Sequence, residues 1–178
     1  MTAPAVLDGP AAASLIPARG LSIRQPWGWA IARRWKPAEN RSRRLPLRYA
    51  GVPVALHASK QYDGFADLPD PAAAKALGAA QGEDPLLTLG AVIAVAVFSG
   101  SHYLSGTGQN CPGSPAGPCS PWSEPCQWHW AVASVHPLAE PVPCRGALGF
   151  WPLPAAVAEA IAVQLPAITG NEKKEATA

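Results

Sequence analysis

Apolar residues alternate along several short stretches of the chain, and the most regular of these predicts a strand over 90–99. In GAVIAVAVF, both alternating sets of side chains are apolar. A strand that is apolar on both faces is covered on both faces, as in a small closed barrel with a helix packed outside it. We therefore expect this stretch at the centre of the fold.

Shorter stretches predict the remaining elements. Alternation or short apolar runs predict strands over 21–23, 52–57, 128–135 and 146–151, with extended chain at 39–41. Helical spacing predicts helices over 27–36, 71–80 and 155–165, and Asp70 is placed to cap the second of these. Because strands and helices are mixed along the chain, the expected fold class is α+β.

The segment 21–41, LSIRQPWGWAIARRWKPAENR, combines apolar spacing with cations, Gln25 and three tryptophans. Trp27 begins an apolar face that recurs at helical spacing, whereas Trp29 and Lys36 fall on the opposite, outward face. Pro37 ends this helix, because the residue before a proline is pushed out of the α region. The spacing alone also fits a plain amphipathic helix with a solvated charged face.

The composition divides the chain into one folded unit and two flanking segments. Residues 1–19 are rich in Ala and Pro and are expected to be a flexible leader, and 166–178 a disordered tail. The domain is expected over 20–154, followed by the helix over 155–165. Within it, 100–125 is a long loop rich in Gly, Pro, Ser and Cys, and a loop of that length is usually functional or mobile.

Overall composition restricts the class of protein without naming a partner. Hydrophobic residues make up 48% of the chain and charged residues 15%, which is enough apolar material for the core of a single domain. No apolar run reaches the roughly 18–20 residues that cross a bilayer, and the first residues do not form a signal peptide. We therefore expect a cytoplasmic monomer with no membrane contact.

The net charge of +2 is small, but its distribution is uneven, because 9 of the 14 Lys and Arg residues lie between positions 24 and 60. Such clustering indicates either a site for a phosphate or polyanion or a solvated basic face.

Four cysteines, Cys111, Cys119, Cys126 and Cys144, lie in the second half of the chain. Without a secretion signal they are expected to be reduced thiols. A zinc site made by the first three with His129 is an alternative, but the spacings C-x7-C and C-x6-C lack the C-x2-C pattern typical of zinc sites. The expectation is therefore no metal and no cofactor.

Seven stretches follow one another along the chain, namely LSIRQPWGWAI, KPAENR, LHASK, GAVIAVAVF, SPWSEP, WHWAVASVHPL and PVPCRGALGFWPLP. Together they resemble the ASCH domain of the PUA-like superfamily. The family pattern G-x-K-x-x-E-x-R is matched by Lys36, Glu39 and Arg41, with Arg34 in place of the glycine. The resemblance implies a small PUA-like β-barrel of about five to six strands with flanking helices. Arg34 and Pro37 imply a helix exit other than the left-handed cap that a glycine allows.

Domains of this family bind RNA or modified bases, so the resemblance implies RNA or a nucleoside-like ligand as the partner, held in a basic cleft. Arg and Lys would hold phosphates, Gln25 and Glu39 would bond to a base edge, and Trp29 or Trp122 would stack on a base. The expected ligand-binding residues are Arg24, Gln25, Trp29, Lys36, Glu39, Arg41, Ser59, Lys60 and Trp122.

An enzyme is the rival interpretation. Some similar proteins hydrolyse acylated cytidine with a Lys and a Thr three residues later, but Glu39 stands in the Thr position here, so that mechanism does not transfer. Others are described as ribonucleases, for which Lys36, Glu39 and His57 are the candidate catalytic residues. Lys36 and Glu39 also fit a structural ion pair, and His57 also fits a structural histidine. A third interpretation is a protein-interaction module in which the cleft is vestigial.

Overall fold

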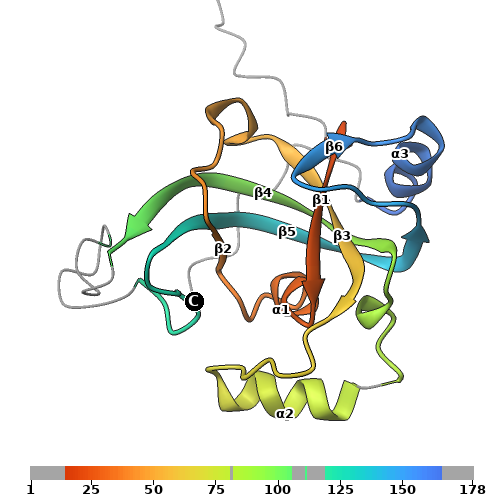
Figure 1. The fold of residues 1–178 in the computed structure, drawn as a ribbon. Coiled ribbons are helices and arrows are strands. Elements are labelled where there is room, and N and C mark those ends of the chain that lie inside the picture. Colours follow the sequence, from red (N-terminus) through yellow and green to blue (C-terminus); the bar gives the residue numbers. More distant parts are fainter. Residues whose placement is uncertain (1–14, 81, 106–110, 112–118, 166–178) are drawn as a thin grey trace, which may run out of the picture.

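The computed structural model describes residues 15–80, 82–105, 111 and 119–165, and a single mixed sheet forms its centre (Figure 1). The order of the strands is β2-β5-β4-β3-β1-β6, and only β1 and β3 run parallel. The strands are β1 (Arg19–Gln25), β2 (Ala38–Arg41), β3 (Pro53–Tyr62), β4 (Ala91–Leu104), β5 (Gln127–Pro143) and β6 (Phe150–Pro152). The α-helices are α1 (Trp27–Ala32), α2 (Pro71–Ala80) and α3 (Ala155–Ala162), and the 3-10 turns are η1 (Leu47–Tyr49) and η2 (Pro85–Leu87).

The sheet curls into a half-barrel, so that strands far apart in its order approach each other. The rings of Trp130 on β5 and Phe150 on β6 are stacked, with centroids 5.5 Å apart. Arg41 on β2 donates from Nη2 to the carbonyl of Ser22 on β1 at 2.9 Å. The expected α+β fold with about six strands and flanking helices is confirmed, and the structure is barrel-like.

The central strand β4 is buried on both faces, as its apolar alternation predicts. Residues Ala91–Ala96 and Phe98 are fully buried. The face of β4 that carries Ile93 packs into a core that includes α1 and part of α2. The face that carries Val95 packs against Ile161 of α3. Figure 1 shows α2 and α3 well apart, and the two apolar clusters explain this, since each helix covers a different core.

Several elements differ in length from expectation. Helix α1 ends at Ala32 rather than at Lys36, and strand β5 continues to Pro143 rather than ending at Val135. Strand β4 runs to Leu104, five residues into the segment expected to be loop, because it pairs with β5 as far as Leu104 and Gln127. The last strand is shorter than expected, because only Phe150–Pro152 pairs with β1. Much of the remaining expected loop, 106–110 and 112–118, lies outside the described residues.

The exit of α1 corrects the expectation for Arg34. Its φ of 64° is left-handed, although it is not a glycine. The amide of Trp35 bonds to the carbonyl of Ala30 at 2.9 Å, and that of Arg34 to the carbonyl of Ile31 at 2.9 Å. This is the Schellman pattern, so the helix ends through the left-handed cap without the family's glycine. Holding an L-residue in this region costs roughly 1–2 kcal/mol.

The ends of the described chain agree in part with the expected segments. Strand β1 begins at Arg19, inside the segment expected to be a leader, and residues 1–14 and 166–178 lie outside the described part. Helix α2 is capped by Asp70, whose Oδ1 accepts from the amide of Ala72 at 2.8 Å, as predicted. Within the described ranges, the helices include none with the length and apolar character needed to cross a membrane.

Candidate functional site

A cleft of about 530 Å³ lies where β1, β2, the start of α1 and the end of β3 meet, and we call it the Lys36 cleft. It brings together five of the predicted site residues, which are Arg24, Lys36, Glu39, Arg41 and Ser59. Residues that are predicted to share a site therefore line one hollow.

A buried ionic network forms one side of the Lys36 cleft. Glu39 receives Lys36 Nζ on Oε2 and Arg41 Nε on Oε1, both at 3.0 Å. Lys36 also donates to the carbonyl of Ala38 at 2.6 Å. The side chains of Lys36 and Glu39 are only 3% and 8% exposed, whereas that of Arg41 is 26% exposed. The expected ion pair is therefore confirmed, and the same residues line the cleft.

Charges in the Lys36 cleft are balanced rather than basic. Its three cationic side chains face three carboxylates, of which Glu39 is one and Asp63 and Glu124 are the others. The expectation of a basic cleft is wrong, because several basic residues that are close in sequence point elsewhere. Arg33 pairs with Asp84 at 2.8 Å, and Arg34 donates to the carbonyl of Val135 at 3.2 Å.

The aromatic residue that lines the Lys36 cleft is Trp27. It is half-buried, and its indole N–H donates to Asp63 Oδ2 at 3.3 Å. Trp122 packs edge-to-face against it at 6.3 Å between ring centroids, but is itself buried. The carbonyl of Trp122 accepts from Asn40 Nδ2 at 2.8 Å, which ties the residue to β2. Trp122 therefore supports the wall behind Trp27 rather than offering its own ring face.

Two predicted ligand-binding residues, Gln25 and Trp29, are buried away from the Lys36 cleft. Gln25 donates to the carbonyl of Leu86 at 2.7 Å and accepts from the amide of Trp29 at 2.8 Å. Trp29 is 1% exposed, and its indole N–H donates to Asp84 at 2.7 Å. The outward placement of Trp29 is therefore wrong. Helix α1 has six residues, of which all but Trp27 are buried, so its periodicity does not distinguish an outer face.

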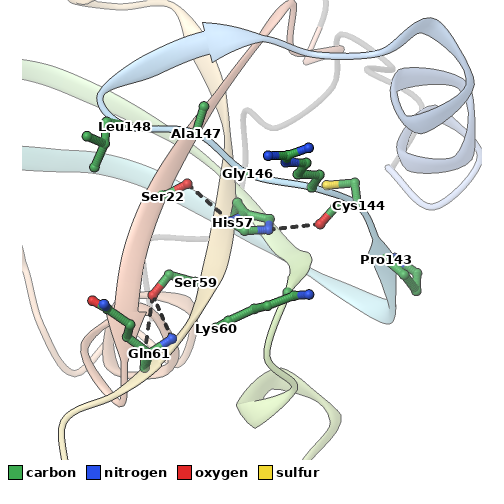
Figure 2. Close-up of a pocket in the computed structure, with 12 residues that line it drawn as sticks. Ser22, His57, Ser59, Lys60, Gln61, Pro143, Cys144, Gly146, Ala147 and Leu148 are labelled. Carbon is green, nitrogen blue, oxygen red and sulfur yellow. Dashed lines mark hydrogen bonds between the residues drawn. The ribbon is translucent and has the colours of Figure 1, made fainter.

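A second hollow, of about 950 Å³, surrounds His57, and we call it the His57 pocket (Figure 2). It shares Ser22, Ser59, Gln61 and Leu148 with the Lys36 cleft, so the two hollows adjoin. Together we call them the groove. Lys60, a predicted site residue, lies in this pocket and not in the Lys36 cleft.

His57 lies at the centre of its pocket and is held from both sides, as Figure 2 shows. Its Nδ1 is 3.2 Å from Ser22 Oγ, and its Nε2 is 3.2 Å from the carbonyl oxygen of Cys144. Since a carbonyl accepts, Nε2 carries the proton and Nδ1 accepts from the Ser22 hydroxyl. Burial lowers the pKa of His57, against the opposing bond to Cys144. The imidazole is therefore a neutral, fully bonded group near neutral pH.

Cationic side chains are unopposed in the His57 pocket. Lys60 and Arg145 line it, both exposed, and no carboxylate is among the described residues that line it. Leu148, which is 98% exposed, stands at the rim shared with the Lys36 cleft. The groove therefore has a polar, charge-balanced end and a positive end.

The proposed catalytic set does not assemble in one hollow. Lys36 and Glu39 line the cleft, whereas His57 lines the adjoining pocket and uses both ring nitrogens in internal hydrogen bonds. Ser22 lies between them, because its carbonyl accepts from Arg41 and its hydroxyl contacts His57.

Several groove residues carry no signal in the sequence that marks them as site residues. The helical spacing of Trp27 predicts a core position, and the residue packs against the core but also lines the cleft together with Arg24. Arg145 and Leu148 belong to the quoted stretch PVPCRGALGFWPLP, but no chemistry distinguishes them before the chain folds back onto β1.

Among the described residues, the group of His and Cys side chains arranged to hold a metal lies outside both hollows. No family model matches the sequence, and no curated protein matches it either.

Proposed function

We propose that the chain is an ASCH-like domain of the PUA-like kind whose groove binds one nucleotide unit, either a modified nucleotide or a nucleotide of single-stranded RNA. The observation that carries this proposal is the union of a charge-balanced cleft beside Trp27 with a pocket whose charged lining residues, Lys60 and Arg145, are both cationic.

The Lys36 cleft suits a base. Trp27 offers a partly exposed indole, and stacking on an aromatic side chain contributes about 1–3 kcal/mol per base. Lys36 has three N–H donors, of which two are used by Ala38 and Glu39, so one is left for a carbonyl or ring nitrogen. Because the network holds Lys36 and Arg41 in place before binding, little side-chain order has to be gained on binding.

The His57 pocket suits a phosphate. Lys60 and Arg145 are both exposed, and phosphate oxygens accept charge-assisted hydrogen bonds from such groups. The neutral His57 and the hydroxyls of Ser22 and Ser59 add uncharged polar groups between the two ends. In this proposal the base binds at one end of the groove and the phosphate at the other.

The test compares nucleosides with nucleoside monophosphates by isothermal titration calorimetry, and adds short single-stranded RNA at several salt concentrations. In a Lys60→Ala/Arg145→Ala variant, affinity for a monophosphate should fall by at least about tenfold, while affinity for the nucleoside stays the same. Trp27→Ala should weaken both ligands by about 5- to 150-fold, corresponding to a lost stacking energy of 1–3 kcal/mol.

The matched control is Lys75→Ala, which removes an exposed cation from α2, away from the groove. If this variant and the Lys60/Arg145 variant lost the same affinity for the monophosphate, the assignment of the phosphate to the His57 pocket would be refuted. Absence of binding for every nucleoside, nucleotide and RNA would refute the function. Cleavage or deacylation that disappears in Lys36→Ala would favour the hydrolase built on Lys36, Glu39 and His57.

A further inference from the structure

Two histidines and two cysteines converge where β4 ends and β5 begins. His102 on β4 and His129 on β5 are direct cross-strand partners, with ring centroids 5.2 Å apart. Cys111 and Cys119 belong to the connection between these two strands. None of these four residues lines the groove.

The four potential ligand atoms face one another. Cys119 Sγ is 3.1 Å from His102 Nε2 and 3.3 Å from His129 Nδ1, and Cys111 Sγ is 3.8 Å from the same Nδ1. All four atoms lie within 4.8 Å of one another. Around a tetrahedral zinc ion, bonds of about 2.3 Å to sulfur and about 2.0 Å to nitrogen set the ligand atoms roughly 3.3–3.8 Å apart. The cluster is therefore close to the size of a zinc site.

The second nitrogen of His129 is engaged in the way that metal-bound histidines require. His129 is fully buried, and its Nε2 lies 2.9 Å from the carbonyl oxygen of Glu124. Because a carbonyl only accepts, Nε2 carries the proton, and the lone pair of Nδ1 is directed at the two sulfur atoms. A histidine that binds a metal usually donates its other N–H to a carbonyl or carboxylate in this manner.

We propose that His102, Cys111, Cys119 and His129 bind a zinc ion. Two thiolates and two imidazoles select zinc over the hard cations, and four protein ligands make a closed, structural site rather than a catalytic one. Each cysteine releases one proton on binding, so the two thiolates neutralise the charge of the ion.

The site changes the ligand set that the sequence suggested. Cys126 fits the run of cysteines before His129, but it is exposed and is absent from the cluster. His102 takes its place, because the β4–β5 register brings it opposite His129.

A zinc ion here would also stabilise the wall of the Lys36 cleft. Glu124, which accepts the hydrogen bond from His129, lines that cleft and donates its amide to Asn40 Oδ1 at 3.4 Å. Asn40 in turn holds the carbonyl of Trp122. One short path therefore joins the ion to the residue that supports Trp27.

The first test is the metal content of the full chain, purified without chelators from zinc-supplemented cells. Elemental analysis should find about one zinc ion per chain. Cys119→Ser and His129→Ala should lose most of it, whereas Cys126→Ser, the matched control, should retain it. A metal-free wild-type protein, or equal loss in the Cys126→Ser variant, would overturn the proposal.

Because a ligand variant can fail to fold, a second measurement uses the wild-type chain alone. Co²⁺ added after chelation should produce the visible bands of tetrahedral cobalt together with thiolate charge-transfer absorption, and one equivalent of Zn²⁺ should abolish both. Octahedral cobalt bands without charge transfer would contradict the ligand set. A Cys111–Cys119 disulfide in protein kept under reducing conditions, found by mass spectrometry, would overturn it as well.

Discussion

Replacing Glu39 by glutamine tests whether the network beside the cleft is an energetic unit. The substitution keeps the shape of the side chain and removes the charge that faces Lys36 and Arg41, each at 3.0 Å. At an effective dielectric of about 20, two unit charges at this distance attract by about 5.5 kcal/mol, and desolvation offsets part of that. Removing one partner of a buried ion pair costs about 3–5 kcal/mol, because the other charge is left without compensation.

The structure also predicts an order among the variants. Lys36→Met should cost less than Glu39→Gln, about 1.5–3 kcal/mol, because Glu39 keeps its bond to Arg41. The double variant should lose less free energy of unfolding than the sum of the two single losses, because the two side chains are in direct contact. The measurement is the free energy of unfolding by urea, with unchanged m-values as the check on two-state behaviour.

The matched control is Arg33→Ala, which breaks a pair with Asp84 of similar length, 2.8 Å, at a more exposed site. The side chain of Arg33 is 43% exposed and that of Asp84 is 8% exposed, so solvent screens this pair more than the Lys36–Glu39 pair. Without Arg33, Asp84 keeps the hydrogen bond from Trp29, so the loss should be smaller than for Glu39→Gln. If Glu39→Gln lost no more stability than Arg33→Ala, the network would not be a buried electrostatic unit, and its proposed role in holding the cleft would be refuted.

Three further predictions concern the groove and the helix exit. A Cβ atom at position 146 would overlap the His57 ring, whereas a Cβ atom at position 64 would have no neighbour within 4 Å. Gly146→Ala should therefore lower the free energy of unfolding by about 1–3 kcal/mol, and Gly64→Ala, the matched control, should leave it unchanged. Arg34→Gly should be more stable than Arg34→Ala by about 1 kcal/mol in the same urea assay, because glycine adopts the left-handed conformation without strain; equal stability would contradict the strain at this position. Since burial lowers the pKa of His57 below its unfolded value of about 6.5, the unfolded chain binds the proton first as the pH falls, and stability is lost from about pH 7 downwards. His57→Asn should reduce this loss in thermal melts between pH 7 and pH 5, and an unchanged slope would show that His57 does not cause it.

Some parts of the fold were determined by local sequence. The two-sided apolar pattern of 90–99 predicted a strand buried on both faces, and Asp70 predicted the start of α2. Lys36 and Glu39 are three residues apart, and the ion pair that this spacing predicts is confirmed. In each case the interacting groups are neighbours along the chain, so short-range geometry determines the result.

Other parts were decided only by the tertiary structure. Trp29 is buried although its spacing predicts an outward position, and Trp27 lines the cleft while also packing against the core. The reason is that α1 is enclosed by the curled sheet and by η2, and burial on nearly all sides leaves no periodic signal. His102 joined His129 in the place expected for Cys126 through the cross-strand register of β4 and β5. Lys60 and Arg145 meet in one pocket although 85 positions separate them in the sequence. The physical reason is common to all three: burial and proximity depend on how distant segments pack, and that information is shared by the whole chain rather than carried by any single stretch.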